Sequence, residues 1–155
     1  MLILSKDEPS AIIKEAAEAG IPETKVIVRY SPRNSLPDYI SVGDCSIFFI
    51  RPTFSKIASS PTKHAELMGM GVPVICNDIG DTGRIIENTN TGILIREFTN
   101  QEYRLMVSKT EQLLSKDKAE IRKAASDYFD LQRGVETYRQ VYKKALKEFS
   151  FVKAV

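Results

Sequence analysis

The sequence predicts a doubly wound α/β fold with a parallel sheet of about five strands. Short β-branched or aromatic runs recur as far as Ile95, and helical patterns separate them. The apolar residues within each run are consecutive, whereas a strand with one exposed face would alternate. We therefore expect helices on both faces of the sheet. Parallel neighbours need crossover connections, which are nearly always right-handed, and this completes the predicted fold class.

The predicted elements alternate between strand and helix from the first residues onward. The first helix is expected to begin after a cap at Glu8, with Pro9 at its first position, and to end at Gly20 and Pro22. A shorter helix is predicted over residues 35–42. The predicted strands are Leu2 to Leu4, Lys25 to Tyr30, Cys45 to Ile50, Val72 to Cys76 and Gly92 to Ile95.

The pattern becomes wholly helical after the last strand, so residues 100–155 form an all-helical C-terminal part of a single domain spanning residues 1–155. The last helix is expected to pack on this sheet or on something outside the chain. Its apolar stripe consists of Val135, Tyr138, Tyr142, Leu146 and Phe149.

Composition excludes several classes of function. With 22 Lys and Arg against 20 Asp and Glu, the net charge of +2 gives no indication of nucleic-acid binding. No apolar run approaches the roughly 20 residues of a transmembrane helix, and the N-terminus lacks the features of a secretory signal, so we expect a cytoplasmic protein. Cys45 and Cys76 fit buried reduced thiols. With His64 as the only histidine, neither a metal site nor a Ser-His-Asp triad is expected.

In an open parallel sheet, ligands bind beyond the carboxyl ends of the strands. The long polar loop 51–60 follows the third predicted strand, and we expect Ser60 to cap a helix whose first residue is Pro61. The amides of Thr62 and Lys63 would then be free to bind an anion such as a diphosphate. The alternative is that Ser60 only caps the helix and Lys63 is solvated.

Glu66 lies one helical turn after Thr62, on the same face. A carboxylate there would repel phosphate but could accept two hydrogen bonds from a vicinal diol, so the two features together describe a nucleoside diphosphate. The alternative is an exposed glutamate that pairs within its own helix.

The stretch from Ser60 to Asp81 resembles the C-terminal domain of the group 1 family of retaining glycosyltransferases, which have the GT-B fold of two Rossmann-like domains. The resemblance extends from about Lys25 to Phe149 and includes the segment 36–44 and the terminal helix. The family's motif places are filled by Glu66, Gly71, Pro73, Val74, Ile75 and Gly80.

The resemblance implies a role for each part of the site, although it assigns no catalytic residue. Glu66 would bind the donor ribose, and the loop Tyr30, Ser31 and Pro32 would lie at the nucleobase unless it is an ordinary turn. Gly80 and Asp81 would line the sugar or phosphate, the alternative being that Asp81 or Thr82 caps the next helix. The residues implied to hold the diphosphate are Ser59, Ser60, Thr62 and Lys63.

The sequence also departs from the family pattern. Ala58 stands where many members have a glutamate that contacts the donor sugar, and Asp81 and Arg84 replace a glycine and a glutamate. The family's first strand, with its Gly-Arg loop and Lys, has no counterpart before Met1. We therefore expect a fragment that lacks the N-terminal acceptor domain and the first strand of its own domain.

The implied reaction is retaining transfer from a nucleotide diphosphate sugar to an acceptor hydroxyl, with no cofactor and no metal. The acceptor would be a glycan or a lipid-linked molecule bound through the missing domain, which could also hold the enzyme at the inner face of the membrane. This chain alone is expected to be inactive. One alternative function is that of a nucleotide-sugar epimerase with the same two-domain architecture. Others are a binding or scaffold protein and a receiver-type module, which Asp7 and Glu8 suit but Arg51, in place of the phosphorylated Asp, does not.

Overall fold

The structure is a computed structural model, which describes the backbone of residues 1–152 and the side chains of residues 1–147. All five predicted strands are present and every pairing between them is parallel. The strands are β1 (Leu2–Leu4), β2 (Ile27–Arg29), β3 (Ser46–Phe48), β4 (Val74–Asn77) and β5 (Gly92–Ile95). Three of the five strands, β2, β3 and β4, are shorter than predicted.

The helices also follow the predicted order. α1 begins after Glu8 with Pro9 at its first position, as expected, and the short helix expected over 35–42 is α2. The loop predicted over 51–60 contains one unexpected helical turn, α3. The helices are α1 (Pro9–Glu18), α2 (Leu36–Ser41), α3 (Phe54–Ile57), α4 (Thr62–Gly69), α5 (Thr82–Thr89), α6 (Asn100–Leu114), α7 (Lys118–Phe129) and α8 (Leu131–Val152), with 3-10 turns η1 (Glu23–Lys25) and η2 (Arg33–Ser35).

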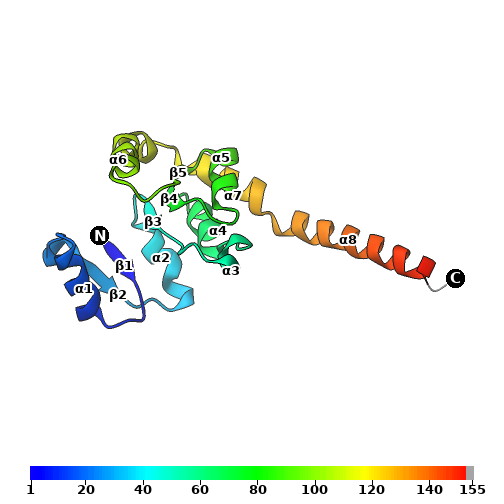
Figure 1. The fold of residues 1–155 in the computed structure, drawn as a ribbon, viewed down its shortest axis with the longest axis horizontal. Coiled ribbons are helices and arrows are strands. Elements are labelled where there is room, and N and C mark those ends of the chain that lie inside the picture. The colour runs from blue at the N-terminus through cyan, green and yellow to red at the C-terminus, as the bar shows by residue number, and fades with distance from the viewer. Residues whose placement is uncertain (153–155) are drawn as a thin grey trace.

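The strands form two hydrogen-bonded sheets, where the sequence predicted one. β1 pairs with β2, and β3, β4 and β5 form a second sheet with β4 at its centre. Figure 1 shows the strands following one another in space in the order β2, β1, β3, β4, β5. The two sheets therefore continue the same layer, but the hydrogen-bonded ladder is interrupted between β1 and β3.

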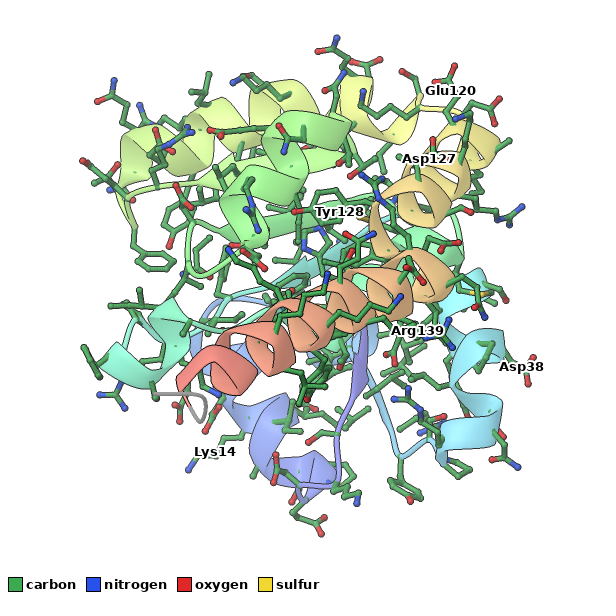
Figure 2. The ribbon with its side chains drawn as sticks, turned by 90° about the vertical axis from the view of Figure 1, so that its right-hand side faces the viewer. Lys14, Asp38, Glu120, Asp127, Tyr128 and Arg139 are labelled. Atoms are coloured by element: carbon green, nitrogen blue, oxygen red, sulfur yellow. The ribbon has the colours of Figure 1, made fainter. Side chains whose placement is uncertain are left out.

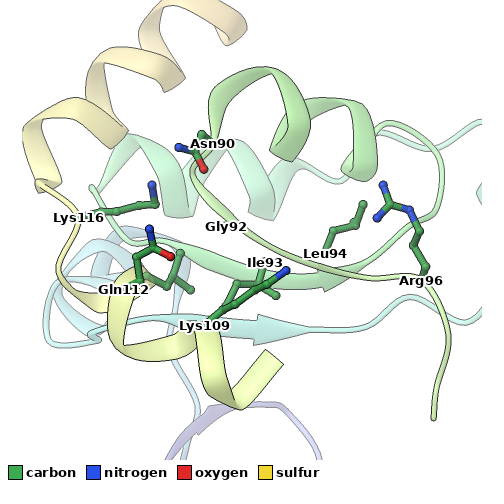
Figure 3. Close-up of a pocket in the computed structure, with 9 residues that line it drawn as sticks. Asn90, Gly92, Ile93, Leu94, Arg96, Lys109, Gln112 and Lys116 are labelled. Carbon is green, nitrogen blue, oxygen red and sulfur yellow. The ribbon is translucent and has the colours of Figure 1, made fainter. Parts of the chain in front are cut away.

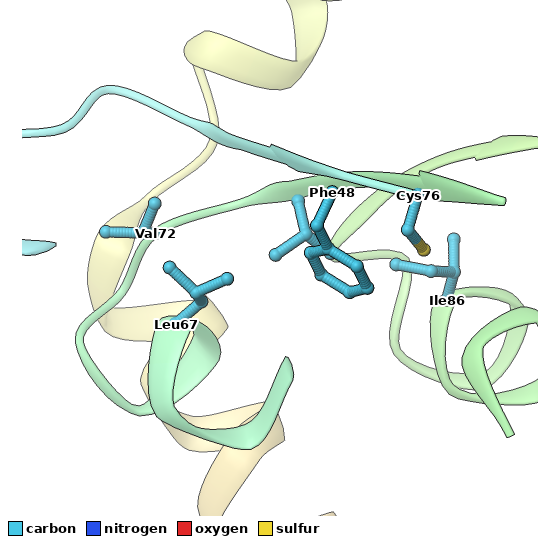
Figure 4. Packing of buried hydrophobic residues seen from close by; sticks show 6 residues of the cluster. Phe48, Leu67, Val72, Cys76 and Ile86 are labelled. Atoms are coloured by element: carbon cyan, nitrogen blue, oxygen red, sulfur yellow. The ribbon is translucent and has the colours of Figure 1, made fainter. Parts of the chain in front are cut away.

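The three-stranded sheet is covered on both faces, as consecutive apolar residues predict. One face packs against α4 and α5, and its buried cluster is drawn in Figure 4. The opposite face packs against α6 through Ile75, Ile93, Ile95 and Leu113. Met68 and Ile85 extend the core outward to α7, which lies over α4. This sheet and its helices hold the ends of β3 and β4 in fixed positions.

The expectation of two covered faces is wrong for β1 and β2. One face packs on α1 through Val26 and Val28. On the other face Leu2 is 37% exposed and its neighbour across the pair, Ile27, is 52% exposed. These two side chains, with Tyr39 and Val42 near α2, line an open apolar groove instead of a closed core. Consecutive apolar residues in β1 and β2 therefore do not correspond to burial on both faces here.

α8 extends away from the rest of the molecule (Figure 1; Figure 2). Val135, Tyr138 and Tyr142 of its apolar stripe are exposed, so packing on this sheet is not observed for them. Phe149 lies outside the residues whose side chains are described. In the part of the chain that the structure describes, no helix is long and apolar enough to cross a membrane.

Candidate functional site

Two loops meet at the carboxyl ends of β3 and β4. The amide of Asp81 donates to the carbonyl of Ser59 across 3.2 Å. Gly80 has a φ of +60°, and a Cβ added there would overlap the Ser59 carbonyl. Glycine is needed at this position for both its backbone conformation and the close approach of the loops. The structure therefore brings Ser59, Gly80 and Asp81 together at the predicted edge of the sheet.

Two buried polar side chains hold these loops in place. Asn77 at the end of β4 accepts from the Ile50 amide at 2.7 Å and donates to the Ile50 carbonyl at 2.9 Å, which extends the sheet by one pair of bonds. The Thr82 hydroxyl, fully buried, accepts from the Ile79 amide at 2.9 Å and donates toward the Asn77 carbonyl at 2.7 Å. The sequence pattern did not indicate this positioning role for either Asn77 or Thr82.

α4 begins one residue later than predicted. Pro61, with ψ of 120°, occupies the N-cap position in an extended conformation, so it is not the first helical residue, and Ser60 does not cap. The His64 amide donates to the Pro61 carbonyl at 2.9 Å. Within residues 1–152, the amides of Thr62 and Lys63 have no hydrogen-bond acceptor. The correction moves the cap but retains two free donors at the helix N-terminus, as expected of an uncapped end.

Lys63 is exposed, as the alternative of a solvated side chain expected, but it also contacts an aromatic ring. Its ammonium lies 5.1 Å from the centroid of the Phe48 ring, at the end of β3. This is within the range of a cation–π contact. The side chain therefore lies over the carboxyl end of the sheet, near the start of its own helix.

Glu66 forms an ion pair with Arg33, which belongs to η2 just after β2. The Glu66 side chain is 26% exposed and that of Arg33 is 79% exposed. The pairing is therefore long-range, not the pair within its own helix that sequence reasoning offered as an alternative. It also brings the segment that follows β2 to the same edge of the sheet as α4. Arg33 was not predicted as a site residue, although it directly follows Tyr30, Ser31 and Pro32, which the resemblance implied at the nucleobase. The signal that could have identified it is its place in the loop after the carboxyl end of a strand.

The loop after β2 presents an aromatic ring. Tyr30 is 58% exposed, and the Lys6 ammonium lies 5.9 Å from its ring centroid. The Ser31 hydroxyl donates to the Pro32 carbonyl at 3.0 Å. No hydrogen bond within the described residues joins this loop to Ser60 or Thr62, so Arg33 is its polar connection to α4.

Neither Asp81 nor Thr82 caps α5 with its side chain. Asp81 occupies the N-cap position, but its carboxylate pairs with Arg84 at 2.8 Å and accepts no helix amide. Asp81 and Arg84, which both depart from the family pattern, are thus bound to each other. In the adjacent α3, Phe54 is 93% exposed and Ile57 is 65% exposed, so an apolar turn that was not predicted stands beside Ser59.

The perturbed titratable groups lie in the core. Burial lowers the pKa of His64 to about 4 and raises that of Cys76 to about 12. His64 packs against the rings of Phe48 and Phe129, and neither ring nitrogen has a hydrogen-bond partner. Both cysteines are free thiols, and Cys76 is buried as predicted, whereas Cys45 is only half-buried. Among residues 1–147, no three His, Cys, Asp or Glu side chains gather as a metal site would require.

A separate hollow of about 310 Å³ lies along β5 and α6, where Lys109, Gln112 and Lys116 point into it (Figure 3). These elements carry none of the predicted site residues. The candidate site is thus the edge formed by the loops after β2, β3 and β4.

Comparison with known proteins gives one result that agrees with this geometry. The family model described as glycosyl transferases group 1 matches residues 1–116, from before β1 to just beyond α6. No curated protein matches the chain. The matched region contains every strand and all the predicted site residues. Because it covers well over half of the sequence, the chain belongs to the group 1 glycosyltransferases.

Proposed function

We propose that this domain binds the nucleotide diphosphate sugar from which the intact enzyme transfers a sugar, with retention, to an acceptor hydroxyl. The observation that carries the proposal is the convergence at one sheet edge of two free α4 amides, Glu66 and the contact between Ser59 and Gly80. An anion site and a diol site one helical turn apart match the diphosphate and ribose of one donor.

The diphosphate belongs at the start of α4. The amides of Thr62 and Lys63 point out of the helix end, where the aligned peptide dipoles favour negative charge. The Thr62 hydroxyl is exposed and adds a donor, and Ser60 stands beside it. The Lys63 ammonium, now over Phe48, needs only a change of rotamer to reach an anion at the helix end.

Glu66 can bind a ribose without losing Arg33. A carboxylate has about four lone-pair positions on its two oxygens. The ion pair with Arg33 uses Oε1. The remaining positions can accept hydrogen bonds from the two ribose hydroxyls. Arg33 would fix the orientation of the carboxylate before the donor arrives, which lowers the entropic cost of binding.

The nucleobase belongs at the loop after β2. The Tyr30 ring is exposed and could stack on a base, with Ser31 and Pro32 bordering it. The ion pair between Arg33 and Glu66 connects this loop to the ribose site. On the other side of the diphosphate, the loop of Gly80 and Asp81 would face the sugar.

The chemical contribution of this domain is electrostatic. As the bond to the sugar breaks, negative charge grows on the leaving diphosphate, and donors already fixed at the α4 N-terminus would stabilise it. Transfer also requires a second domain that binds a glycan or lipid-linked acceptor and excludes water. The 155-residue chain alone should therefore bind donor without turnover. The free thiols suit a reducing cytoplasm.

Calorimetry tests the proposal directly. We expect the chain to bind one of UDP, GDP, ADP or dTDP, and Glu66→Gln to weaken that binding by about 1–3 kcal/mol, the scale of hydrogen bonds to a charged group. Glu111→Gln, at an exposed α6 position, removes the same charge away from the site and should leave affinity unchanged. Equal affinities of Glu66→Gln and the unsubstituted chain would remove Glu66 from the site, and failure to bind any of the four would refute the donor assignment.

A further inference from the structure

β5 is the outer strand of its sheet, and in the part of the chain that the structure describes its far edge has no neighbouring strand. Toward β4, the Ile95 carbonyl accepts from the Asp78 amide at 3.0 Å. Peptide groups alternate between the two edges of a strand. The N–H and C=O groups of Gly92 and Leu94 therefore point to the far edge, where no backbone group of the described residues pairs with them.

The hollow of about 310 Å³ runs along this unpaired edge (Figure 3). Residues 92–94 of β5 form one wall. α6 supplies a second wall with Lys109, Gln112 and Lys116, which share one face of the helix because they are spaced by three and four residues. Unpaired backbone groups and a row of side-chain donors thus face the same space.

The hollow is positively charged. Among the described residues that line it there are three cations and no carboxylate. The Arg96 guanidinium is already paired with Asp78 and Glu87. Lys109 and Lys116 form no ion pair within residues 1–147. A ligand that carries carboxylates or other negative groups would therefore complement these two lysines.

The backbone edge favours a peptide over a small anion. A small anion could accept from the amides of Gly92 and Leu94 but could not donate to their carbonyls. An extended peptide satisfies both kinds of group by pairing as a strand. The Arg96 amide donates to the Glu102 carboxylate at 3.4 Å, so the unpaired stretch ends at Leu94 and only a short segment can pair.

The two faces of β5 specify which side chains such a segment would carry. Ile93 faces α6, whereas Leu94 packs toward the opposite face and is half-buried. On an added strand, residues on the α6 side would meet Lys109 and Lys116, and the alternate residues would lie beside Leu94. The matching pattern is an alternation of acidic and apolar residues.

We propose that the hollow along β5 binds an extended acidic segment of a partner polypeptide, which pairs with Gly92 and Leu94 as an additional strand and places its carboxylates against Lys109 and Lys116. A second copy of this chain is less suitable, because its β5 carries the same lysines and lysine at a strand edge opposes pairing with a like edge. The proposal is independent of donor binding, since none of the residues proposed to bind the donor lines the hollow.

Amide hydrogen exchange of the 155-residue chain tests the proposal, with a short peptide of alternating glutamate and valine as the probe. At saturating peptide, we expect the amides of Gly92 and Leu94 to exchange at least about tenfold more slowly. A peptide of alternating lysine and valine is the matched control and should protect neither amide. Equal exchange rates with and without the glutamate peptide, or equal protection by both peptides, would overturn the proposal.

Substitution of the lysines tests the charge complementarity by calorimetry. Lys109→Gln together with Lys116→Gln should weaken binding of the glutamate peptide by about 2–30-fold, the range expected for the loss of two exposed ion pairs. Lys109→Gln alone, at a fully exposed position, should give part of this loss. Lys143→Gln, at an exposed position of α8, removes the same charge elsewhere and should leave affinity unchanged. Unchanged affinity of the double variant, with a native circular dichroism spectrum, would also overturn the proposal.

Two other occupants would give results that contradict it. If the hollow is a simple anion site, inorganic pyrophosphate will shift the side-chain resonances of Lys109 and Lys116, and the glutamate peptide will leave Gly92 and Leu94 unprotected. If a second copy fills the hollow, light scattering will show a dimer in which these two amides are protected without peptide. We expect a monomer whose Gly92 and Leu94 amides are protected by the glutamate peptide and not by pyrophosphate.

Discussion

His64 should make the stability of this domain depend on pH. The imidazole is fully buried against Phe48 and Phe129, and burial lowers its pKa from 6.5 to about 4. Below pH 6.5 His64 binds a proton in the unfolded chain but not in the folded chain, so the free energy of unfolding decreases as pH falls. The stability is therefore fully present above the unfolded pKa and is lost as pH falls toward the folded one.

The size of this effect follows from the shift. One pKa unit corresponds to 1.36 kcal/mol, so a fall from about pH 7 to about pH 5 should cost about 2 kcal/mol, and a fall below the folded pKa about 3 kcal/mol. A typical domain has about 5–15 kcal/mol in total, so the change is measurable. The assay is urea unfolding followed by circular dichroism at both pH values.

His64→Leu is the informative variant. It removes the titrating ring and two buried nitrogens that have no hydrogen-bond partner, so stability near pH 7 should be unchanged or higher. The loss between about pH 7 and about pH 5 should be about 2 kcal/mol smaller than in the unsubstituted chain. Because the chain has one histidine, its imidazole resonance can also be titrated without ambiguity. A resonance that titrates near 6.5, or equal pH dependence in both proteins, would refute the reasoning.

Three further substitutions test how the site loops are held. Gly80→Ala should destabilise the fold by about 2 kcal/mol or more in thermal unfolding and abolish nucleotide binding, because φ is +60° and the new Cβ would overlap Ser59. The control is Gly20→Ala, where φ is +84° but the space around the Cβ is open. This variant should show only the smaller cost of the backbone conformation. Equal losses would rule out the loop contact. Asn77→Leu should cost about 2 kcal/mol in urea unfolding by removing two bonds to Ile50. Thr82→Val should cost about 1–3 kcal/mol in the same assay, and a neutral result would show that its buried hydroxyl does not hold the loop.

Local sequence patterns predicted the elements of the fold well because each is encoded over a few neighbouring residues. Pro9 after Glu8 marks the start of α1, and the apolar run containing Val74 gives the fully buried β4. The predicted start of α4 was wrong by one residue, because proline can occupy either the first position of a helix or the extended position just before it. Only the ψ of 120° at Pro61 distinguishes the two.

Features that depend on distant residues could not be read in this way. Arg33 and Glu66 are 33 residues apart, and no periodicity connects them. The interruption between β1 and β3 is equally invisible, because a strand's run of apolar residues says nothing about which strand lies beside it. The runs of consecutive apolar residues therefore predicted burial of Leu2 and Ile27, but no helix covers their face of the strands and both side chains are exposed.

The same ion pair connects the split of the sheet with the proposed donor site. Within the described residues, Arg33 to Glu66 is the one ion pair between residues 1–35 and residues 44–147. A nucleotide held at both Tyr30 and α4 would cross the same junction that lacks hydrogen bonds between β1 and β3. A ligand that binds only the joined arrangement stabilises it by mass action. Donor binding should therefore fix β2 and its loop relative to α4, across the junction that the ion pair between Arg33 and Glu66 already spans.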